Sequence, residues 1–534
     1  MGRKFRPGAA PGQAMLMPAD PRDWLPPGHL AWRVLEMAAE MDLSRFGARY
    51  RPDGQGGRPY DPAVMAALLL YCYCRGRRSS REIEMATYDD VGARIICGGL
   101  HPDHSTVAEF VRRNLEAVCA LLPESVKACA AEGLVSLDVV AGDGTKLKAN
   151  AAMAANATAA QLDAQIAELQ ALIEAEFRQW AQDMLDGQVP AGGPRRGDGP
   201  GGGAGGAQGK NKPPRAEQTL AARKAARAQL AARQAQKEQP TLEARAAECA
   251  ERAQRKQEAA GRAWQAAAGK LEAWERKAAA GRPPRGRKPW EPDADRDVIR
   301  TRAQADKARA RAQAAAAALA SGPAPDGAAK VNTTDWASRV MPLKKGGFDQ
   351  LVNAQALATA RSQVILAIMR HGNSTDTGAL HPLLAMARAV LDAAGITSPI
   401  GKAAFDAGYA SDANFTAAAE AELYVALARE SVQAGRSDGR QPQSALPSWQ
   451  DMAARLDTPE GKAVYKKRAA TIEPVFAQLV SRLGRALNYR GDLADAELHL
   501  WAASHNLLKA ITARTARQAR EARTARAAAV PAAV

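Results

Sequence analysis

Apolar positions recur at helical spacing through the N-terminal part of the chain. In DPAVMAALLLYCYCRG a continuous apolar run follows Asp61, which can cap a helix, and Pro62, which suits a first helical turn. Gly76 after the run is a typical helix end. A second helical pattern, in PDHSTVAEF, has Ser105 or Thr106 as its expected cap. These patterns predict an all-α domain at the start of the chain.

The pattern changes to strand-like apolar runs after Val331. Four runs, VNAQALAT, SQVILAIMRH, KAAFDAG and LYVALAR, alternate with helical patterns in TGALHPLLAMARAVLDAAG and SDANFTAAAEA. An earlier run, SLDVVAGD, has the same character, although residues 153–330 separate it from the others. Because that segment is too long for a loop inside a compact domain, we expect an insertion into one α/β domain.

The segment 153–330 is rich in Ala, Arg, Gln, Lys and Glu, which favour helices, and is broken by flexible stretches rich in Gly and Pro. We expect a helix, a linker and then long helices. The apolar stripe of the first helix consists of Leu162, Ile166, Leu169, Leu172 and Ile173. The stripe fits coiled-coil dimerisation, and it fits packing of the helix on its own domain equally well.

These patterns predict an α/β fold class with six segments along the chain. They are a disordered N-terminus (1–19), a helical N-terminal domain (20–132), the first strand of the α/β domain (133–152), a basic Ala/Arg-rich helical insertion with a Gly-rich linker (153–330), the remainder of the α/β domain (331–512) and a basic C-terminal tail (513–534).

The composition favours a polyanionic partner. Lys and Arg number 73 against 57 Asp and Glu, giving a formal charge of +16 that suits nucleic acid. The start, MGRKFRPGAAPGQ, lacks the apolar core of a signal peptide, and no apolar run reaches the roughly 18 residues of a membrane span. The six cysteines show no disulfide spacing. We therefore expect a cytoplasmic, nucleoid-associated protein with free thiols.

Three acidic residues stand out by their context. Asp143 and Asp406 each end an apolar strand and precede a glycine within two residues, and Glu473 lies in YKKRAATIEPVF. If the two strands are neighbours in one sheet, both aspartates project from the same edge. Taken alone, Asp143-Gly144 is also a common hairpin-turn pair, and Asp406 could begin another turn.

A cluster of three carboxylates suits hard divalent cations. Mg²⁺, with Mn²⁺ as an alternative, prefers carboxylate oxygens, and paired ions can promote phosphoryl displacement. Lys146 and Lys148 are expected to offset nearby phosphates, and Tyr465 and Arg468 are expected to contact phosphate or base. The sequence thus predicts a site where a metal and DNA meet.

Pro474 follows Glu473 directly, and proline is best tolerated in a first helical turn or at a kink. We therefore expect Glu473 near the start of a helix or at a bend. The apolar stripe that would dock this helix on the sheet consists of Ile472, Val475, Phe476, Leu479 and Leu483.

Other groups of side chains have competing interpretations. Cys72 and Cys74, with His101 and His104, have zinc-ligand chemistry, but two residues so spaced on a helix face different ways, which favours small core residues. We interpret His505 as structural. The basic insertion and the arginine-rich tail are either DNA-binding arms or solvated spacers. The same alternatives apply to the basic residues Arg75, Arg77, Arg78 and Arg81.

The ordered blocks DGTKLKANAA, FDAGYASDANF and YKKRAATIEPVF resemble the three acidic blocks of DDE transposases of bacterial insertion sequences, in the group with a Tyr-Arg-Glu signature. Flanking similarities include NTTDWASRVM, TPEGKAVYKKR and SHNLLKA. The resemblance covers roughly residues 20–150 and 330–510 and excludes the insertion.

The resemblance implies a ribonuclease-H-like catalytic domain, interrupted by the helical insertion. It implies Mg²⁺-dependent cleavage at transposon ends and transfer of the freed 3′-hydroxyl into target DNA, by a homodimer or larger synaptic complex. Asp143, Asp406 and Glu473 map onto the metal-binding triad, and Tyr465 and Arg468 onto the residues before the glutamate.

One departure concerns the lysine that the family usually carries seven positions after the glutamate. Val480 stands there in this chain, and Arg482, two residues on, points about 200° away on a helix, so it is an imperfect substitute. Two alternatives follow. The first is an inactive remnant that acts as a DNA-binding repressor, and the second is a nuclease without strand transfer.

Overall fold

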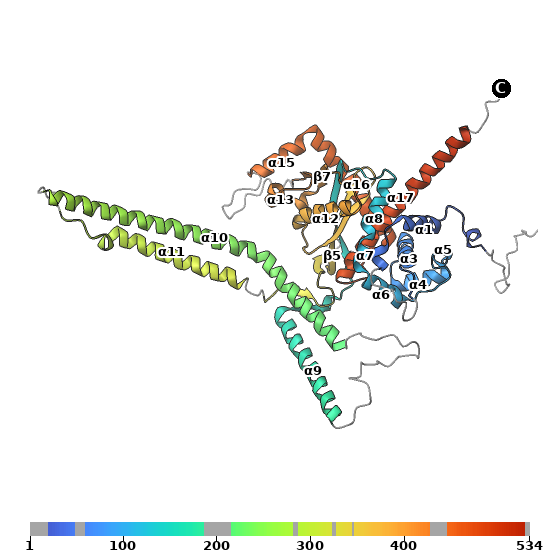
Figure 1. Ribbon diagram of the computed structural model, residues 1–534, viewed down its shortest axis with the longest axis horizontal. Helices are drawn as coiled ribbons and strands as arrows, with labels where there is room; N and C mark the ends of the chain where they lie inside the picture. Colours follow the sequence, from blue (N-terminus) through green and yellow to red (C-terminus); the bar gives the residue numbers. More distant parts are fainter. Residues whose placement is uncertain are drawn as a thin grey trace, which may run out of the picture. The chain divides into compact units, whose positions relative to one another are not determined.

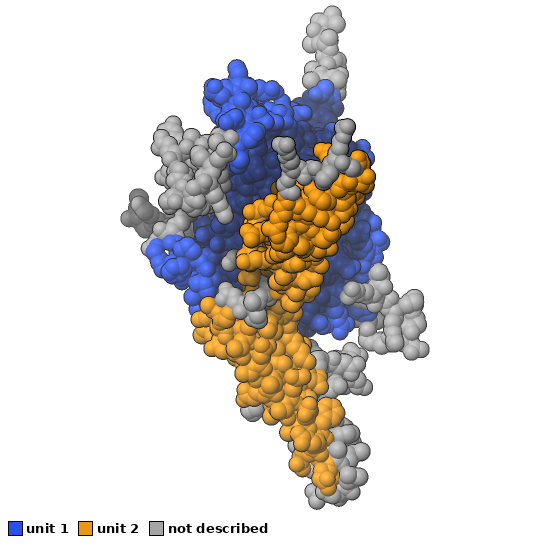
Figure 2. All heavy atoms as spheres, turned by 90° about the vertical axis from the view of Figure 1, so that its left-hand side faces the viewer, with its two compact units in different colours: residues 1–153, 337–534 blue, residues 154–336 orange. Residues whose placement is uncertain are grey.

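The computed structural model describes residues 20–47, 59–185, 215–280, 287–322, 327–343, 346–427 and 446–528. The expected disordered N-terminus and the Gly-rich linker lie outside these residues. The chain divides into two compact units (Figure 2). Unit 1 comprises residues 1–153 and 337–534, and unit 2 comprises residues 154–336.

The N-terminal part of unit 1 is helical. Asp61 caps α3 by accepting a backbone N–H bond of 2.8 Å, and Gly76 adopts a left-handed φ of 82° after the helix. The cap of α6 is Asp103 and not Ser105 or Thr106, because Asp103 accepts the backbone N–H of Thr106 at 2.9 Å. The helices are α1 (Leu30–Glu40), α2 (Ser44–Gly47), α3 (Pro62–Cys74), α4 (Ser80–Asp89), α5 (Val91–Ile96), α6 (His104–Arg113), α7 (Leu115–Cys119) and α8 (Leu121–Ala131).

A mixed six-stranded sheet completes the core of unit 1. Its strands are β1 (Val139–Lys148), β4 (Arg339–Pro342), β5 (Phe348–Thr359), β6 (Ile365–His371), β7 (Lys402–Phe405) and β8 (Glu422–Val425). Their order is β4, β5, β1, β7, β8, with β6 also paired to β5. β1 runs antiparallel to β5 and parallel to β7. The strand before the insertion and those after it therefore share one sheet, as the apolar runs predict.

The Asp143-Gly144 pair lies inside β1, so the hairpin-turn interpretation is wrong. Asp143 pairs with Ala356 of β5, and Gly144 pairs with Gln355. A Cβ on Gly144 would clash with Nε2 of Gln355 and would lie 2.8 Å from Oδ1 of Asp376. Glycine is required here because these two side chains need the space.

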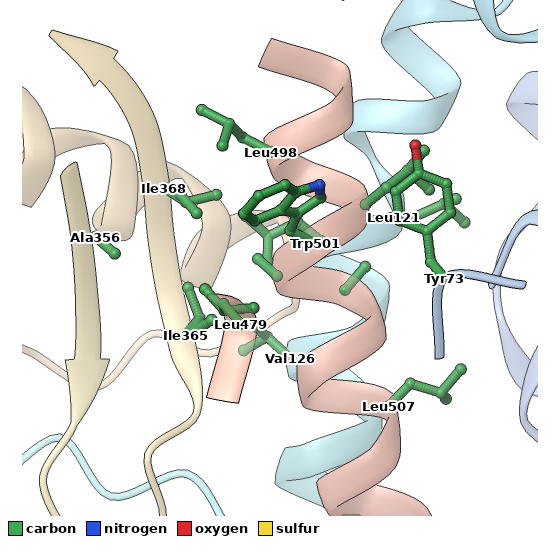
Figure 3. Close-up of a cluster of buried hydrophobic side chains, with 14 of the residues drawn as sticks. Tyr73, Leu121, Val126, Ala356, Ile365, Ile368, Leu479, Leu498, Trp501 and Leu507 are labelled. Carbon is green, nitrogen blue, oxygen red and sulfur yellow. The ribbon is translucent and has the colours of Figure 1, made fainter. Parts of the chain in front are cut away.

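Helices from the C-terminal half pack around the sheet. They are α12 (Leu380–Ala393), α13 (Asp412–Thr416), α15 (Pro447–Asp457), α16 (Pro459–Leu483) and α17 (Asp492–Ala528). Trp501 of α17 is buried in the main core, between strand residues such as Ile368 and helical residues such as Tyr73 and Leu121 (Figure 3). The N-terminal helices and the sheet therefore share one hydrophobic core.

Glu473 lies in the middle of α16, so the expectation of a helix start is wrong, whereas the alternative of a bend stays a prediction. The helix continues through Pro474, which lacks the N–H that would bond to the carbonyl of Ala470. The side chain of Gln363, in the turn between β5 and β6, donates to that carbonyl instead, at 3.2 Å. This contact from outside the helix supplies the missing partner and explains why sequence-local reasoning failed.

The arginine-rich end of the chain is helical as far as Ala528. Arg514 forms ion pairs with Glu40 (2.6 Å) and Glu132 (2.7 Å), and Arg517 pairs with Glu132 at 3.0 Å. Two tail arginines thus bind the N-terminal helices of their own unit.

Unit 2 contains the short antiparallel pair β2 (Asn156–Thr158) and β3 (Lys330–Asn332) and three long helices. The helices are α9 (Ala159–Leu185), α10 (Arg215–Ala279) and α11 (Arg296–Ser321). α10 and α11 run side by side (Figure 1). Leu162 of the α9 stripe is buried with Leu230 of α10, whereas Leu172 is half exposed. The stripe thus begins as packing within the unit. No helix in the described ranges has the length and apolarity to cross a membrane.

Candidate active site

Asp143 and Asp406 project from neighbouring parallel strands. Ala141 of β1 pairs with Ala404 of β7, so two residues further on Asp143 and Asp406 stand at equivalent positions at the same edge of the sheet. Strand β7 ends at Phe405, and Asp406 caps the following turn by accepting the N–H of Gly408 at 2.9 Å. The sheet topology brings together two acids that are far apart in sequence.

The two aspartates stand in a desolvated, negatively charged environment. Burial raises the pKa of Asp143, and the carboxylate of Asp406 raises it further, against the N–H of Gly144 and the guanidinium of Arg468. Burial also raises the pKa of Asp406, with a further contribution from Asp376. The ionised form of each carboxylate is therefore unfavourable in this environment, and a bound cation would stabilise it.

Arg468 of α16 lies between the acids. Its Nη1 donates to Oδ2 of Asp143 at 3.1 Å, and its Nη2 lies 3.8 Å from Oε1 of Glu473. The Glu473 side chain is 62% exposed, whereas that of Asp143 is only 21% exposed. Burial alone would lower the pKa of Arg468, but Asp143 and other neighbours raise it, so the guanidinium stays charged. Arg468 supplies the positive charge that these carboxylates require.

Tyr465 stands one helical turn before Arg468, and the Arg468 guanidinium lies 5.9 Å from the centre of its ring. The predicted Tyr465, Arg468 and Glu473 therefore occupy one helix next to β1. Position on α16, and not sequence proximity, places them beside Asp143.

Asp376 is a fourth acid at this site, and sequence reasoning missed it. Its Oδ1 accepts from Nδ2 of Asn353 (2.8 Å) and Nε2 of Gln355 (2.6 Å), both on β5. A Cβ on Gly408 would lie 3.0 Å from Oδ1 of Asp406 and 3.1 Å from Oδ2 of Asp376. The two carboxylates thus flank the same glycine.

No sequence signal distinguishes Asp376 as strongly as the strand-end aspartates. It stands in a turn, NSTDTGAL, where an acid before a helix is usually a cap. Its side chain makes no capping bond, however, and points to the amides on β5. The alternation of Asn353 and Gln355 on an otherwise buried apolar strand is the only hint, because two buried amides on one face require partners.

Three other predicted DNA contacts do not join this cluster. Strand alternation places Lys146 and Lys148 on the face of β1 opposite Asp143. Lys146 is exposed, and Lys148 is paired with Asp349 at 2.9 Å. Arg482 lies nine residues beyond Glu473 on α16 and lines a different cavity.

The acidic donors fit a hard cation in their chemistry, because all four are carboxylates around a charged guanidinium. Within the described residues, no three His, Cys, Asp or Glu side chains gather closely enough to hold a metal ion. Glu473 is joined to Asp143 only through Arg468. A metal would therefore require Arg468 or Glu473 to move.

The alternative zinc cluster is not assembled. Cys72 and Cys74 are buried in α3, which confirms them as core residues, and the His101 ring contacts the Thr87 hydroxyl at 3.0 Å. His104 bonds Glu84 at 2.8 Å.

His505 is buried and contacts the carbonyl of Gln363 at 2.9 Å, in agreement with a structural role. Three of the basic residues that follow α3 have partners in the fold, and the first is Arg75, whose Nε lies 3.8 Å from Oδ2 of Asp90. Arg77 pairs with Asp89 at 2.6 Å, and Arg78 donates to the carbonyl of Ala486 and pairs with Glu497. These contacts favour a structural role for Arg77 and Arg78.

Two family models match the chain. One, described as a transposase domain (DUF772), matches residues 19–113, and the other, described as a transposase DDE domain, matches residues 440–511. Together the two matches support an insertion-sequence DDE transposase. No curated protein and no solved structure matches it.

The two matched spans fall on different parts of unit 1 of the transposase. The first covers the N-terminal helices through α6, and the second covers α15, α16 and the first half of α17. Glu473 and Arg468 lie within the second span, whereas Asp143 and Asp406 lie outside both. The carboxylate cluster therefore rests on the fold and on the sequence blocks.

Proposed function

We propose that this transposase cleaves DNA at transposon ends in a Mg²⁺-dependent reaction and transfers the freed 3′-hydroxyl into target DNA. Asp143, Asp406 and Glu473 form the catalytic triad of this proposal. The observation that carries it is that Asp143, inside β1, and Asp406, directly after β7, stand at equivalent positions on neighbouring strands, with Arg468 bridging Asp143 to Glu473. Membership of the group with a Tyr-Arg-Glu signature is supported by Tyr465, Arg468 and Glu473 on one helix.

The sheet supports a ribonuclease-H-like catalytic domain within this proposal. β1 has antiparallel β5 on one side and parallel β7 on the other, with β8 following in parallel. The insertion leaves after β1 and returns before β4, so the catalytic acids lie on both sides of it in sequence.

The residues of the chain have distinct roles in the proposed reaction. Asp143, Asp406 and Glu473 would hold the divalent ions, Mg²⁺ or Mn²⁺, which when bound would promote attack and stabilise the leaving oxygen. Arg468 pairs with Asp143 in the structure, and its guanidinium would contact the scissile phosphate in the reaction, because it can pair with either anion. Tyr465 stacks beside Arg468 and limits its orientation. Water is the first nucleophile and the 3′-hydroxyl is the second.

Asp376 orients the site in this proposal. Because one of its oxygens is fixed by two amide donors, the other stays turned towards Gly408 and Asp406. The hydroxyl of Tyr409 donates to Gln355 and fixes the amide that holds Asp376. Such outer contacts commonly tune metal sites.

DNA is the proposed partner of unit 2 as well as unit 1. A groove of about 900 Å³ between α10 and α11 is lined by Arg245, Arg252, Lys256, Lys307 and Arg311, with Glu248 as its only acidic residue. In the described part of the chain, none of these five cations pairs with a carboxylate. Other arginines on the same helices do pair, including Arg255, Arg262, Arg300 and Arg309.

This division of charges favours a DNA-binding arm over a solvated spacer. A spacer needs only neutralised or dispersed charge for solubility, whereas unpaired cations along a groove suit successive phosphates. We expect the active form to be a homodimer or larger complex at the nucleoid, because joining requires two transposon ends.

The test is a cleavage and joining assay with DNA that carries the element's ends. Joined products favour the transposase, and hydrolysed products without joining favour the nuclease alternative. Binding without either product favours the inactive remnant. The reason to test for an inactive remnant is Val480, which is half-buried two turns beyond Glu473.

A further inference from the structure

A second cavity in unit 1 is cationic and separate from the acidic cluster. It has a volume of about 490 Å³ and lies between the C-terminal end of α16, the middle of α17 and the turn between β5 and β6. Its polar lining residues are Ser362, Gln478, Arg482, His505, Lys509 and Thr512. None of its lining residues is acidic.

Arg482 carries a buried donor without a partner. Its Nη1 is inaccessible to solvent and makes no hydrogen bond within the described residues. An unsatisfied donor on a charged group is costly, because its hydration is lost and nothing replaces it. Because Nη1 has no access to solvent, an anion in the cavity would meet the guanidinium at its other N–H groups.

Lys509 adds a second charge with little compensation. Its ammonium makes only a long contact of 3.5 Å, with the neutral Oε1 of Gln363. Burial lowers the pKa of Lys509, and the nearby Arg482 lowers it further. In the described chain neither cation forms an ion pair with a carboxylate, whereas Arg514 on the same helix pairs with both Glu40 and Glu132.

The turn beside the cavity is held in an unusual conformation. Gln363 has a φ of 56°, in the left-handed region that a residue with a side chain seldom adopts. Its side chain accepts from Nε2 of Gln478 at 3.3 Å, and its carbonyl contacts His505 at 2.9 Å. These bonds fix Ser362, the residue before Gln363, at the cavity wall.

We propose that this cavity binds a phosphate group. A tetrahedral oxyanion in the cavity would accept from the guanidinium of Arg482 and from the ammonium of Lys509 and would offset both charges. The hydroxyls of Ser362 and Thr512 are further donors at the wall. The phosphate is either a free anion or part of a DNA backbone, and the two sources share this chemistry.

The cavity is distinct from the proposed catalytic site. Arg482 lies nine residues beyond Glu473, which places it about 13 Å further along the helix. The inference needs no catalytic activity, so it stands if DNA cleavage fails.

Calorimetric titration of the full chain with inorganic phosphate, at constant ionic strength, tests the inference. We expect one equivalent to bind the wild type, and Arg482→Gln and Lys509→Gln each to weaken binding by about tenfold or more, the value of one charge-assisted hydrogen bond. Arg520→Gln is the matched control, since Arg520 is exposed on α17 outside the cavity. Circular dichroism confirms folding, and Arg482→Lys, which keeps the charge, replaces a variant that fails to fold.

A second experiment, competition between phosphate and a short DNA duplex, identifies the source of the phosphate. If phosphate displaces a short duplex from the wild type but not from the two cavity variants, the site binds DNA backbone. If phosphate binds while duplex affinity is unchanged in both variants, the site binds a free anion. Absence of phosphate binding to the wild type, or equal binding by the cavity variants and Arg520→Gln, would overturn the proposal.

Discussion

At the scale of residues, burial and mutual repulsion disfavour the ionised carboxylates of the candidate site when no cation is bound. The pKa values of Asp143 and Asp406 are raised, chiefly by burial. A carboxyl group whose pKa is higher in the folded than in the unfolded state stabilises the fold at low pH. That contribution is lost as pH rises through the folded pKa.

Asp406→Asn should therefore raise the Tm in EDTA at neutral pH, because it removes a buried charge that repels Asp143 and Asp376. It should also flatten the fall in Tm as pH rises from about 4, the ordinary aspartate range. Thermal unfolding across pH measures both effects. Asp457→Asn removes the charge of an exposed acid whose pKa is lowered by Lys462, so this control should not raise the Tm. A lower Tm for Asp406→Asn would contradict the account.

Asp376→Asn keeps an oxygen for Asn353 and Gln355 but removes the charge beside Asp406. If Asp376 orients the site, Mg²⁺ affinity should fall by about 10- to 100-fold, as for other outer contacts of metal sites. Calorimetry with Mg²⁺ measures this, again with Asp457→Asn as control. Unchanged affinity would restrict Asp376 to a structural role.

Val480 occupies the position where the family usually has a lysine, two turns after Glu473 on α16. If that lysine binds DNA in the family, Val480→Lys should increase cleavage, because a cation on this face would neutralise a phosphate. Cleavage rates at matched protein concentration provide the measurement. A decrease, with folding intact, would show that the half-buried valine is needed for packing.

At the scale of elements, the apolar runs predicted the strand before Asp406 and the start of the strand that carries Asp143. The expectation that Asp143 ends its strand is wrong, because pairing with β5 continues β1 through the polar residues as far as Lys148. The position of Glu473 within a helix could not be predicted from the local sequence. The carbonyl that Pro474 leaves without a backbone donor accepts a hydrogen bond from a side chain in a distant turn. Strand alternation also separates Lys146 and Lys148 from Asp143, although all three are close in sequence. Asp376 was invisible because its partners stand on another strand.

The α10–α11 groove gives an element-scale prediction. Changing Arg245, Arg252, Lys307 and Arg311 together to Gln should reduce the salt dependence of DNA binding, by about 0.9 in the log–log slope for each phosphate that the protein no longer neutralises. The matched set of Arg255, Arg262, Arg300 and Arg309 removes the same charge from ion-paired positions. Equal effects of the two sets would show that the groove has no special role.

At the scale of the whole molecule, unit 1 combines both transposase family matches with a sheet edge that gathers carboxylates, and unit 2 is a helical insertion with its own basic groove. The first boundary between the two units lies at residues 153–154, where the composition of the chain changes. Neither composition nor periodicity indicated which cations would be paired, because pairing depends on the helix faces that meet.

The most direct test is cleavage and joining of a plasmid that carries the gene's own flanking DNA, in Mg²⁺ and in EDTA, with wild type beside Asp406→Ala and Asp457→Ala. The account predicts metal-dependent cuts at the element's ends and joined products for the wild type and Asp457→Ala. It predicts a loss of at least about 100-fold for Asp406→Ala, with DNA binding retained. Cleavage that persists in EDTA or in Asp406→Ala would contradict the carboxylate mechanism.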